Sequence, residues 1–195
     1  WYSTIFGGYY FAGCVIAILA LLVIVSMALQ AAGLLGRAVT TEHYHDLGKF
    51  MFGFTVFWAY IAFSQYLLIW YASIPEETIW YLHRLEGSWK YWSLAVLFGH
   101  FIIPFLVLVL RRSKRDLRML WVAAIWFLVF HFVDTYFQVM PTFNKHGVHL
   151  HWLDIACLLA PASIYALVFW MHTRRSNLLP TGDPRFELGL HFHQV

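Results

Sequence analysis

Two ionisable side chains, three residues apart, stand inside an apolar stretch of this chain. They are His131 and Asp134, in the stretch from Met119 to Val139. Residues three apart share one face of a helix, so the imidazole and the carboxylate would lie side by side. Ionisable groups inside a membrane span are costly and therefore candidates for function. The pair has the chemistry to hold and pass a proton.

Other polar groups fall at a similar depth in neighbouring apolar stretches. At 1.5 Å per residue, Asp134 lies about 7.5 Å and His131 about 12 Å below the outer end of their stretch. His100 lies about 13.5 Å deep in its own stretch, and Asp154 about 6 Å deep. We expect them to form one outer layer with His131 and Asp134. The alternatives are that His100 only pairs with a neighbouring helix, and that Asp154 is a first-turn acid at a helix N-terminus.

A second polar cluster reads TTEHYHDLGK, from Thr40 to Lys49. The functional interpretation is a set of proton-uptake groups on the inner side. The alternative is a solvated helix start with Thr41 as its N-cap. Two polar regions with an apolar gap between them suit a gated proton route better than an open pore. The candidate residues of this inner cluster are Glu42, His43, His45 and Asp46.

The elements that position these groups must cross a bilayer. Of the 195 residues, 61% are hydrophobic and 12% charged, whereas soluble domains are about 25% charged. This composition excludes an ordinary soluble enzyme, a disordered chain and a disulfide scaffold. A bilayer core of about 30 Å needs about 20 apolar residues in a helix. We therefore expect an all-α, polytopic transmembrane helix bundle with a tail over 176–195 and five spans, near 9–31, 49–71, 91–110, 119–139 and 150–172.

Basic residues predict how the chain is oriented. The segment from Arg111 to Arg118 holds five basic residues in eight. The positive-inside rule places this segment in the cytoplasm. With five spans, Trp1 then lies outside and the C-terminus inside. The net charge of +3 is small, and no basic run is interleaved with exposed polar residues, so the sequence gives no support for a nucleic-acid partner.

Pro104 adds one expectation for the third span. It lacks an N–H, so the carbonyl four residues earlier, that of His100, would lose its helical partner. His100 and His131 also lie at nearly equal depth, as bis-His ligation of a haem requires. The residues alone therefore leave several classes open: a b-type haem anchor, a quinone- or proton-handling respiratory subunit, a transporter, or a purely structural assembly subunit.

A longer block narrows these classes by resemblance. The stretch TTEHYHDLGKFMFGFTVFWAYIAFSQYLLIWYASIPEET, from Thr40 to Thr78, resembles the NrfD-like (polysulfide-reductase-anchor-like) membrane subunits of bacterial alternative complex III. That complex is a quinol:cytochrome c oxidoreductase. The segments FHFVDTYFQVMP, HWLDI and LPTGDPRFELGLHFHQV fit the same family.

The resemblance implies a larger subunit and a set of partners. Family members have about ten spans in two four-helix bundles with flanking helices, so this chain, which begins with Trp, would match the C-terminal half. It implies no redox cofactor in this chain. Quinol or quinone, iron–sulfur clusters and c-type haems would belong to partner subunits: a sister NrfD-like subunit, an iron–sulfur subunit and c-type cytochromes, with a terminal oxidase as a further partner. The location would be the bacterial inner (cytoplasmic) membrane, among its lipids.

The resemblance also implies a role for the two polar clusters. The family is thought to offer proton half-channels. These map onto Glu42, His43, His45 and Asp46 inside, and onto His131, Asp134 and Asp154 outside. His100 lies outside the matching segments and is a candidate by depth alone. The chain would then be a non-catalytic or proton-translocating subunit of an oxidoreductase.

Overall fold

The computed structural model describes residues 3–36, 38–144, 147–180, 182–184, 186 and 190. Over these residues the chain is helical and has no strand. The third long helix is composite, with a π-helical segment, η1, between α4 and α5. In chain order the elements are α1 (Phe6–Ala31), α2 (Thr41–Ala72), α3 (Pro75–Leu85), α4 (Trp89–Ala95), η1 (Val96–Ile102), α5 (Ile103–Val109), α6 (Arg111–Arg115), α7 (Leu117–Val139), η2 (Met140–Thr142) and α8 (Trp152–Thr173).

Five of these helical stretches are long and apolar enough to cross a membrane, which confirms the predicted all-α, multi-pass architecture. The spans run over Phe6–Ala31, Thr41–Ala72, Trp89–Val109, Leu117–Thr142 and Trp152–Thr173. Four of them begin within three residues of the predicted start. The predicted tail lies beyond the last span, and much of it falls outside the described residues.

The second span departs from its predicted start at residue 49. It begins at Thr41, so the inner polar cluster forms the first two turns of α2. Thr40, with extended backbone, is the N-cap, and the expectation of Thr41 at that position was wrong by one residue. The Thr40 N–H donates to Nδ1 of His43 at 3.2 Å, and the Thr40 hydroxyl lies 3.0 Å from the same atom. This reciprocal cap satisfies groups that a helix N-terminus otherwise leaves unpaired, so the polar residues are helical.

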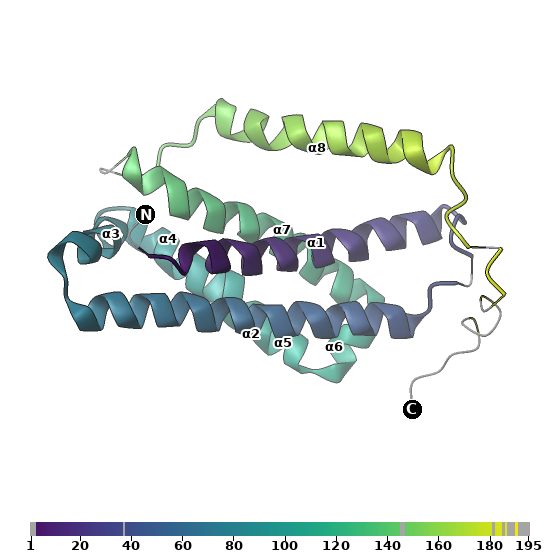
Figure 1. The fold of residues 1–195 in the computed structure, drawn as a ribbon, viewed down its shortest axis with the longest axis horizontal. Coiled ribbons are helices and arrows are strands. Elements are labelled where there is room, and N and C mark those ends of the chain that lie inside the picture. Colours follow the sequence, from purple (N-terminus) through teal and green to yellow (C-terminus); the bar gives the residue numbers. More distant parts are fainter. Residues whose placement is uncertain are drawn as a thin grey trace.

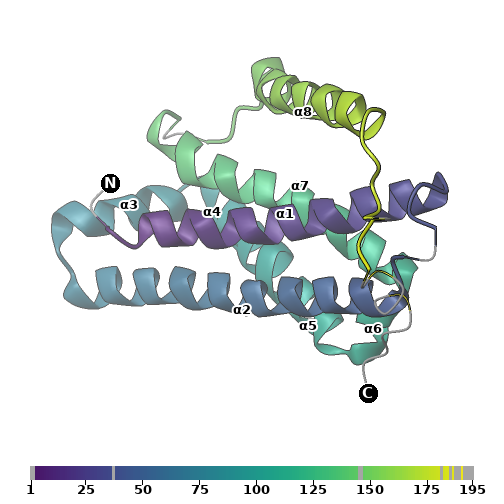
Figure 2. The ribbon, with the colours of Figure 1, turned by 45° about the vertical axis from the view of Figure 1, so that its right-hand side comes forward.

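Helix α1 is the central element of the packed bundle. It lies between α2 and α7 in both views (Figures 1 and 2). Its buried face carries Ala12, Ile16, Ala20 and Val23, at helical spacing. Small residues on such a face let neighbouring backbones approach closely.

The carbonyl freed by Pro104 is that of Gly99, and not that of His100 as predicted. The π-helical turn shifts the hydrogen-bond pattern by one residue, so the Ile103 N–H bonds to the Phe98 carbonyl. The Gly99 carbonyl would be next, but Pro104 has no N–H to give it. The indole N–H of Trp126 in α7 donates to it instead, at 2.7 Å. The proline therefore joins the third span to the fourth.

Gly99 is also a point of close contact between these two spans. A Cβ added at Gly99 would lie 1.9 Å from Cε1 of the Phe130 ring. We expect Gly99→Ala to lower the stability of the chain by about 1–3 kcal/mol, the usual range for overpacking. Thermal unfolding in detergent measures this. The matched control is Gly53→Ala, because a Cβ at Gly53 meets nothing within 4 Å. Equal melting temperatures for the two variants would contradict the prediction.

Helix α8 differs from the other spans in its surroundings. None of its residues is buried, and its ribbon lies apart from α1 and α2, beyond α7 (Figures 1 and 2). An apolar span of this kind needs lipid or another helix around it.

Candidate functional site

Asp134 is the best-buried carboxyl group of the described chain, with 3% of its surface exposed. It lies on α7, and the hydroxyl of Tyr9 on α1 donates to its Oδ1 at 2.5 Å. The side-chain amide of Gln138, one turn further along α7, lies 3.5 Å from the same oxygen. A buried polar group is costly unless it is hydrogen-bonded. Tyr9 supplies that bond and ties α1 to α7.

His131 lies one turn from Asp134 on α7. Its ring lies over Gly13 of α1, where an added Cβ would come within 3.2 Å of Nδ1. The glycine therefore makes the space that the imidazole occupies. Among the described residues, Nδ1 of His131 is buried without a hydrogen-bond partner. Such a nitrogen is free to accept or donate through a water or a proton carrier.

His100 joins the same region through an aromatic ring. It is fully buried, and its ring centroid lies 4.4 Å from that of Trp58 on α2. The Trp58 ring in turn lies 5.2 Å from that of Tyr9. His100 interacts with the backbone of Phe130, and the Trp58 indole interacts with the Asp134 carboxyl group, although neither contact has the geometry of a full hydrogen bond.

Four spans therefore meet around one buried polar region, as the depth calculation predicted for three of its residues. Sequence reasoning missed the others. Gln138 stands four residues after Asp134, and this spacing signals a shared helix face. The one feature of the sequence that could have pointed to Tyr9 is a hydroxyl group on a residue inside a predicted span. We call this region the Asp134 cluster, and its members are Tyr9, Trp58, His100, His131, Asp134 and Gln138.

Asp154 lies elsewhere. Its Oδ2 accepts the backbone N–H of His151 at 2.8 Å and so caps the start of α8. This geometry is that of the first-turn alternative. Within the described residues no hydrogen bond or ion pair links Asp154 to the Asp134 cluster.

The inner candidates lie together on the first two turns of α2. Three of them have side-chain contacts that give them a structural role. Glu42 forms an ion pair with Arg115 of α6. His43 completes the cap with Thr40. Asp46 lies 2.6 Å from the Lys49 ammonium.

His45 differs from these three. It is buried, and its Nδ1 has no hydrogen-bond partner among the described residues. It is therefore the inner candidate whose side chain is least explained by a structural contact. Proton uptake by this group stays a prediction.

An apolar stretch separates the two polar regions along α2. His45 and Trp58 are 13 residues apart, or about 20 Å. Thr55 is buried between them, and its hydroxyl donates to the Met51 carbonyl at 2.7 Å. That bond occupies the hydroxyl within its own helix. The gap therefore has the character of a barrier.

Arg84 supports the Asp134 cluster from outside the spans, and sequence reasoning did not single it out. It lies near the end of α3, a short helix that begins with Pro75, and only 2% of it is exposed. Its guanidinium donates to the carbonyls of Gln138 at 2.6 Å and of Phe137 at 3.3 Å, at the end of α7. Burial lowers the pKa of Arg84 to about 10, so the side chain remains charged at neutral pH. A cation at a helix C-terminus is favourable.

The packing around His100 bears on the b-type haem alternative. A porphyrin bound to this ring would need the space that Trp58 and Phe127 fill, with ring centroids 4.4 and 6.2 Å away. The packing of the His100 ring against Trp58 and Phe127 therefore argues against haem ligation by this residue.

A spectrum tests this directly. We expect no b-type absorbance band in the reduced-minus-oxidised spectrum of the purified chain. A band in the wild type that disappears in the double variant His100→Ala/His131→Ala would contradict this expectation and restore the haem alternative.

Comparison with known proteins leaves the family open. No protein-family model matches the chain, and a search of curated proteins finds no match. The resemblance to NrfD-like subunits therefore rests on the quoted segments.

Proposed function

We propose that this chain is a membrane subunit of a respiratory quinol:cytochrome c oxidoreductase of the alternative complex III type, and that it holds and passes protons at Asp134. The observation that carries the proton role is the buried carboxyl group of Asp134, bonded to Tyr9 with His131 one turn away. A carboxyl group buried inside a span is expensive to maintain, which favours a function for it. The assignment to a respiratory complex is supported by the resemblance of residues 40–78.

The residues of the Asp134 cluster have distinct parts in this proposal. Asp134 takes up and releases the proton. The Tyr9 hydroxyl stabilises its carboxylate when the proton is absent, because a charged acceptor forms the stronger hydrogen bond. His131, deeper along α7 as the chain is predicted to be oriented, is the next group that can hold a proton. The apolar stretch of α2 around Thr55 then acts as the gate between this region and His45.

The redox chemistry belongs to partner subunits in this proposal. Quinol oxidation releases protons on the outer side and sends electrons to iron–sulfur clusters and c-type haems. This chain carries no redox cofactor of its own. It scaffolds the complex in the bacterial inner membrane and offers the proton route.

A gentle detergent pull-down of the chain from its native membranes tests the assignment to a complex. Mass spectrometry should find c-type cytochromes, an iron–sulfur subunit and a sister NrfD-like subunit with it. If the chain comes down alone under conditions that preserve other respiratory complexes, the proposed complex is wrong.

A further inference from the structure

Helix α3 joins the second span to the third, and it lies at the end of the bundle where α2 ends (Figures 1 and 2). Contacts with three spans fix its level. The Tyr81 ring lies 5.1 Å from that of Tyr66, near the end of α2. The Arg84 guanidinium binds carbonyls at the end of α7, and the Arg84 carbonyl accepts the Ser93 hydroxyl of α4 at 2.7 Å. The helix therefore lies beside the ends of the spans, where they leave the hydrocarbon core.

Two stripes of opposite character run along α3. Ile79, Leu82 and Leu85 follow one another at intervals of three residues, so they form an apolar stripe on one side of the helix. All three are exposed. Glu76 and His83 are seven residues apart, or about two turns, and form a polar stripe beside the apolar one. Apolar and polar stripes side by side are the pattern of an amphipathic helix.

The remaining side of α3 is held against the bundle by Arg84. Its guanidinium donates to the carbonyls of Phe137 and Gln138 on α7 and lies 3.5 Å above the Trp80 ring. Turning α3 so that its apolar stripe packed inward would break both bonds to α7. A buried charged donor that loses its partners is costly. The apolar stripe is therefore held outward.

Exposed aromatic side chains mark the level at which α3 lies. Trp70 and Tyr71 belong to the last turn of α2, and Tyr91 to the first turn of α4. All three are exposed. Trp and Tyr are enriched at the membrane–water interface, where one part of the ring meets acyl chains and the other meets water. Since α3 connects the two helix ends that carry them, the boundary between head groups and acyl chains is what meets its apolar stripe.

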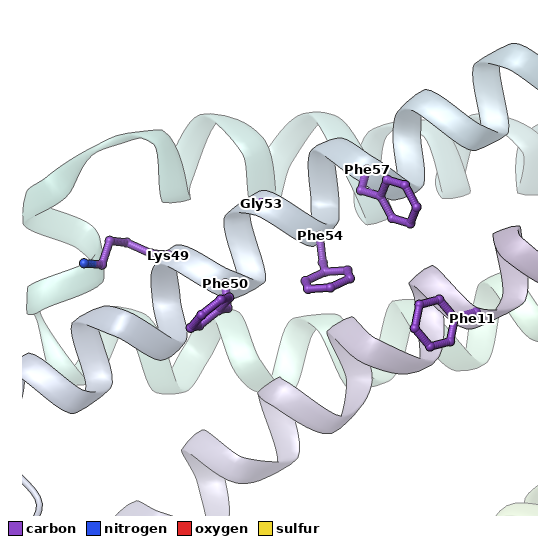
Figure 3. A pocket seen from close by; sticks show the side chains of 6 residues that line it. All are labelled: Phe11, Lys49, Phe50, Gly53, Phe54 and Phe57. Atoms are coloured by element: carbon purple, nitrogen blue, oxygen red, sulfur yellow. The ribbon is translucent and has the colours of Figure 1, made fainter.

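A shallow groove between α1 and α2 shows how the flank of a span differs from α3. Its volume is about 390 Å³, and it is lined by Phe11, Lys49, Phe50, Gly53, Phe54 and Phe57 (Figure 3). The lining is apolar except for Lys49, whose ammonium pairs with Asp46. Such a face suits the hydrocarbon core at any depth. The paired stripes of α3 suit one depth, because each stripe needs a different solvent.

We infer that α3 binds the lipid–water interface of the bilayer, with its apolar stripe among the upper ends of the acyl chains and its polar stripe in water. Through Arg84 the helix then sets the level of the last turn of α7 in the membrane. The inference goes beyond the proposed function and does not depend on it.

Spin labels on the full chain test the inference in vesicles of dioleoyl-phosphatidylcholine. A chain with Cys14→Ala and Cys157→Ala carries a nitroxide at one introduced cysteine. Electron paramagnetic resonance then compares collisions of the label with oxygen, which concentrates in the bilayer, and with a nickel chelate, which stays in water. The ratio of the two gives the depth. We expect the label of Leu82→Cys to lie about 5–10 Å below the phosphates, the usual depth of an interfacial apolar face.

Reference variants keep the test specific. His83→Cys places the label on the polar stripe at nearly the same level along the helix, and it should collide mainly with nickel. Phe63→Cys replaces an exposed residue inside the second span and should collide mainly with oxygen. Ile79→Cys repeats the measurement one turn earlier on the apolar stripe, so the test stays decisive if Leu82→Cys fails to fold.

Two results would overturn the inference. The first is equal access of nickel to the labels of Leu82→Cys and His83→Cys, which would place the apolar stripe in water. The second is a label at Leu82→Cys that neither oxygen nor nickel reaches. That result would mean that protein covers the stripe, either a second copy of the chain or another part of this one.

Discussion

Replacing Asp134 by Asn is expected to slow quinol-dependent proton release and cytochrome c reduction by the assembled complex about 100-fold. General acid–base groups typically contribute at least this factor. Asparagine has the same shape, and its carbonyl oxygen still accepts the Tyr9 hydroxyl. The chain should therefore fold and assemble, while the proton-carrying group is lost. Measurement in proteoliposomes gives turnover and proton release from the same sample.

A matched carboxylate tests whether the effect is local. Asp154→Asn changes a carboxyl group that caps α8 and has no bond to the Asp134 cluster in the described chain. Turnover should stay at the wild-type value, with a small loss of helix stability, since the asparagine amide oxygen can still accept the His151 N–H from the third position of the helix. Unchanged turnover and coupling in a fully assembled Asp134→Asn complex would count against the proton role and favour a purely structural subunit.

The sequence predicted the spans well because their signal is local. Length and continuous hydrophobicity identify a helix that must satisfy its own backbone in lipid. The start of α2 was missed because the polar run from Thr41 to Asp46 contains no apolar signal. What extends the helix there is the cap between Thr40 and His43, which adds two turns that hydropathy does not show. The π-helical turn before Pro104 was missed for a similar reason, since hydropathy gives no sign of it, and the indole N–H that bonds its Gly99 carbonyl comes from Trp126 on another helix.

The candidate site was predictable only as far as helical spacing reaches. His131 and Asp134 share a face by sequence arithmetic, and Gln138 follows the same rule. Tyr9 and Asp134 are 125 residues apart, so their contact follows from how α1 packs and not from any local pattern. Asp154 shows the converse. Similar depth in a neighbouring span did not bring it into the cluster, because depth fixes one coordinate and helix rotation and position fix the others.

Replacing Arg84 by Ala is expected to destabilise the chain by about 3 kcal/mol. The guanidinium makes three hydrogen bonds to backbone carbonyls, those of Trp80, Phe137 and Gln138. Its charge also lies 3.5 Å above the Trp80 ring. Charged hydrogen bonds contribute about 1.5–3 kcal/mol each and a desolvated cation–π contact about 2 kcal/mol. The cost of burying the charge, several kcal/mol, offsets much of that sum. Thermal unfolding in detergent measures the difference.

One variant separates the effect of the planar, branched guanidinium of Arg84 from the effect of its charge, and a second variant serves as a control. Arg84→Lys keeps the charge but cannot bridge three carbonyls, so we expect an intermediate loss of stability. Arg118→Ala removes an exposed arginine at the other end of α7 and should change stability by less than about 0.5 kcal/mol. A wild-type melting temperature for Arg84→Ala would show that α3 does not hold the end of α7.

The same variant tests how the Asp134 cluster is positioned. Arg84 binds the main-chain carbonyl of Gln138, and the Gln138 side chain approaches Asp134. Loss of the guanidinium should therefore let the last turn of α7 fray and weaken the support of the carboxyl group. We expect turnover to fall in Arg84→Ala by less than in Asp134→Asn, and to fall further on warming, as the turn opens. A loss of turnover that does not change with temperature would mean that Arg84 acts by its charge alone.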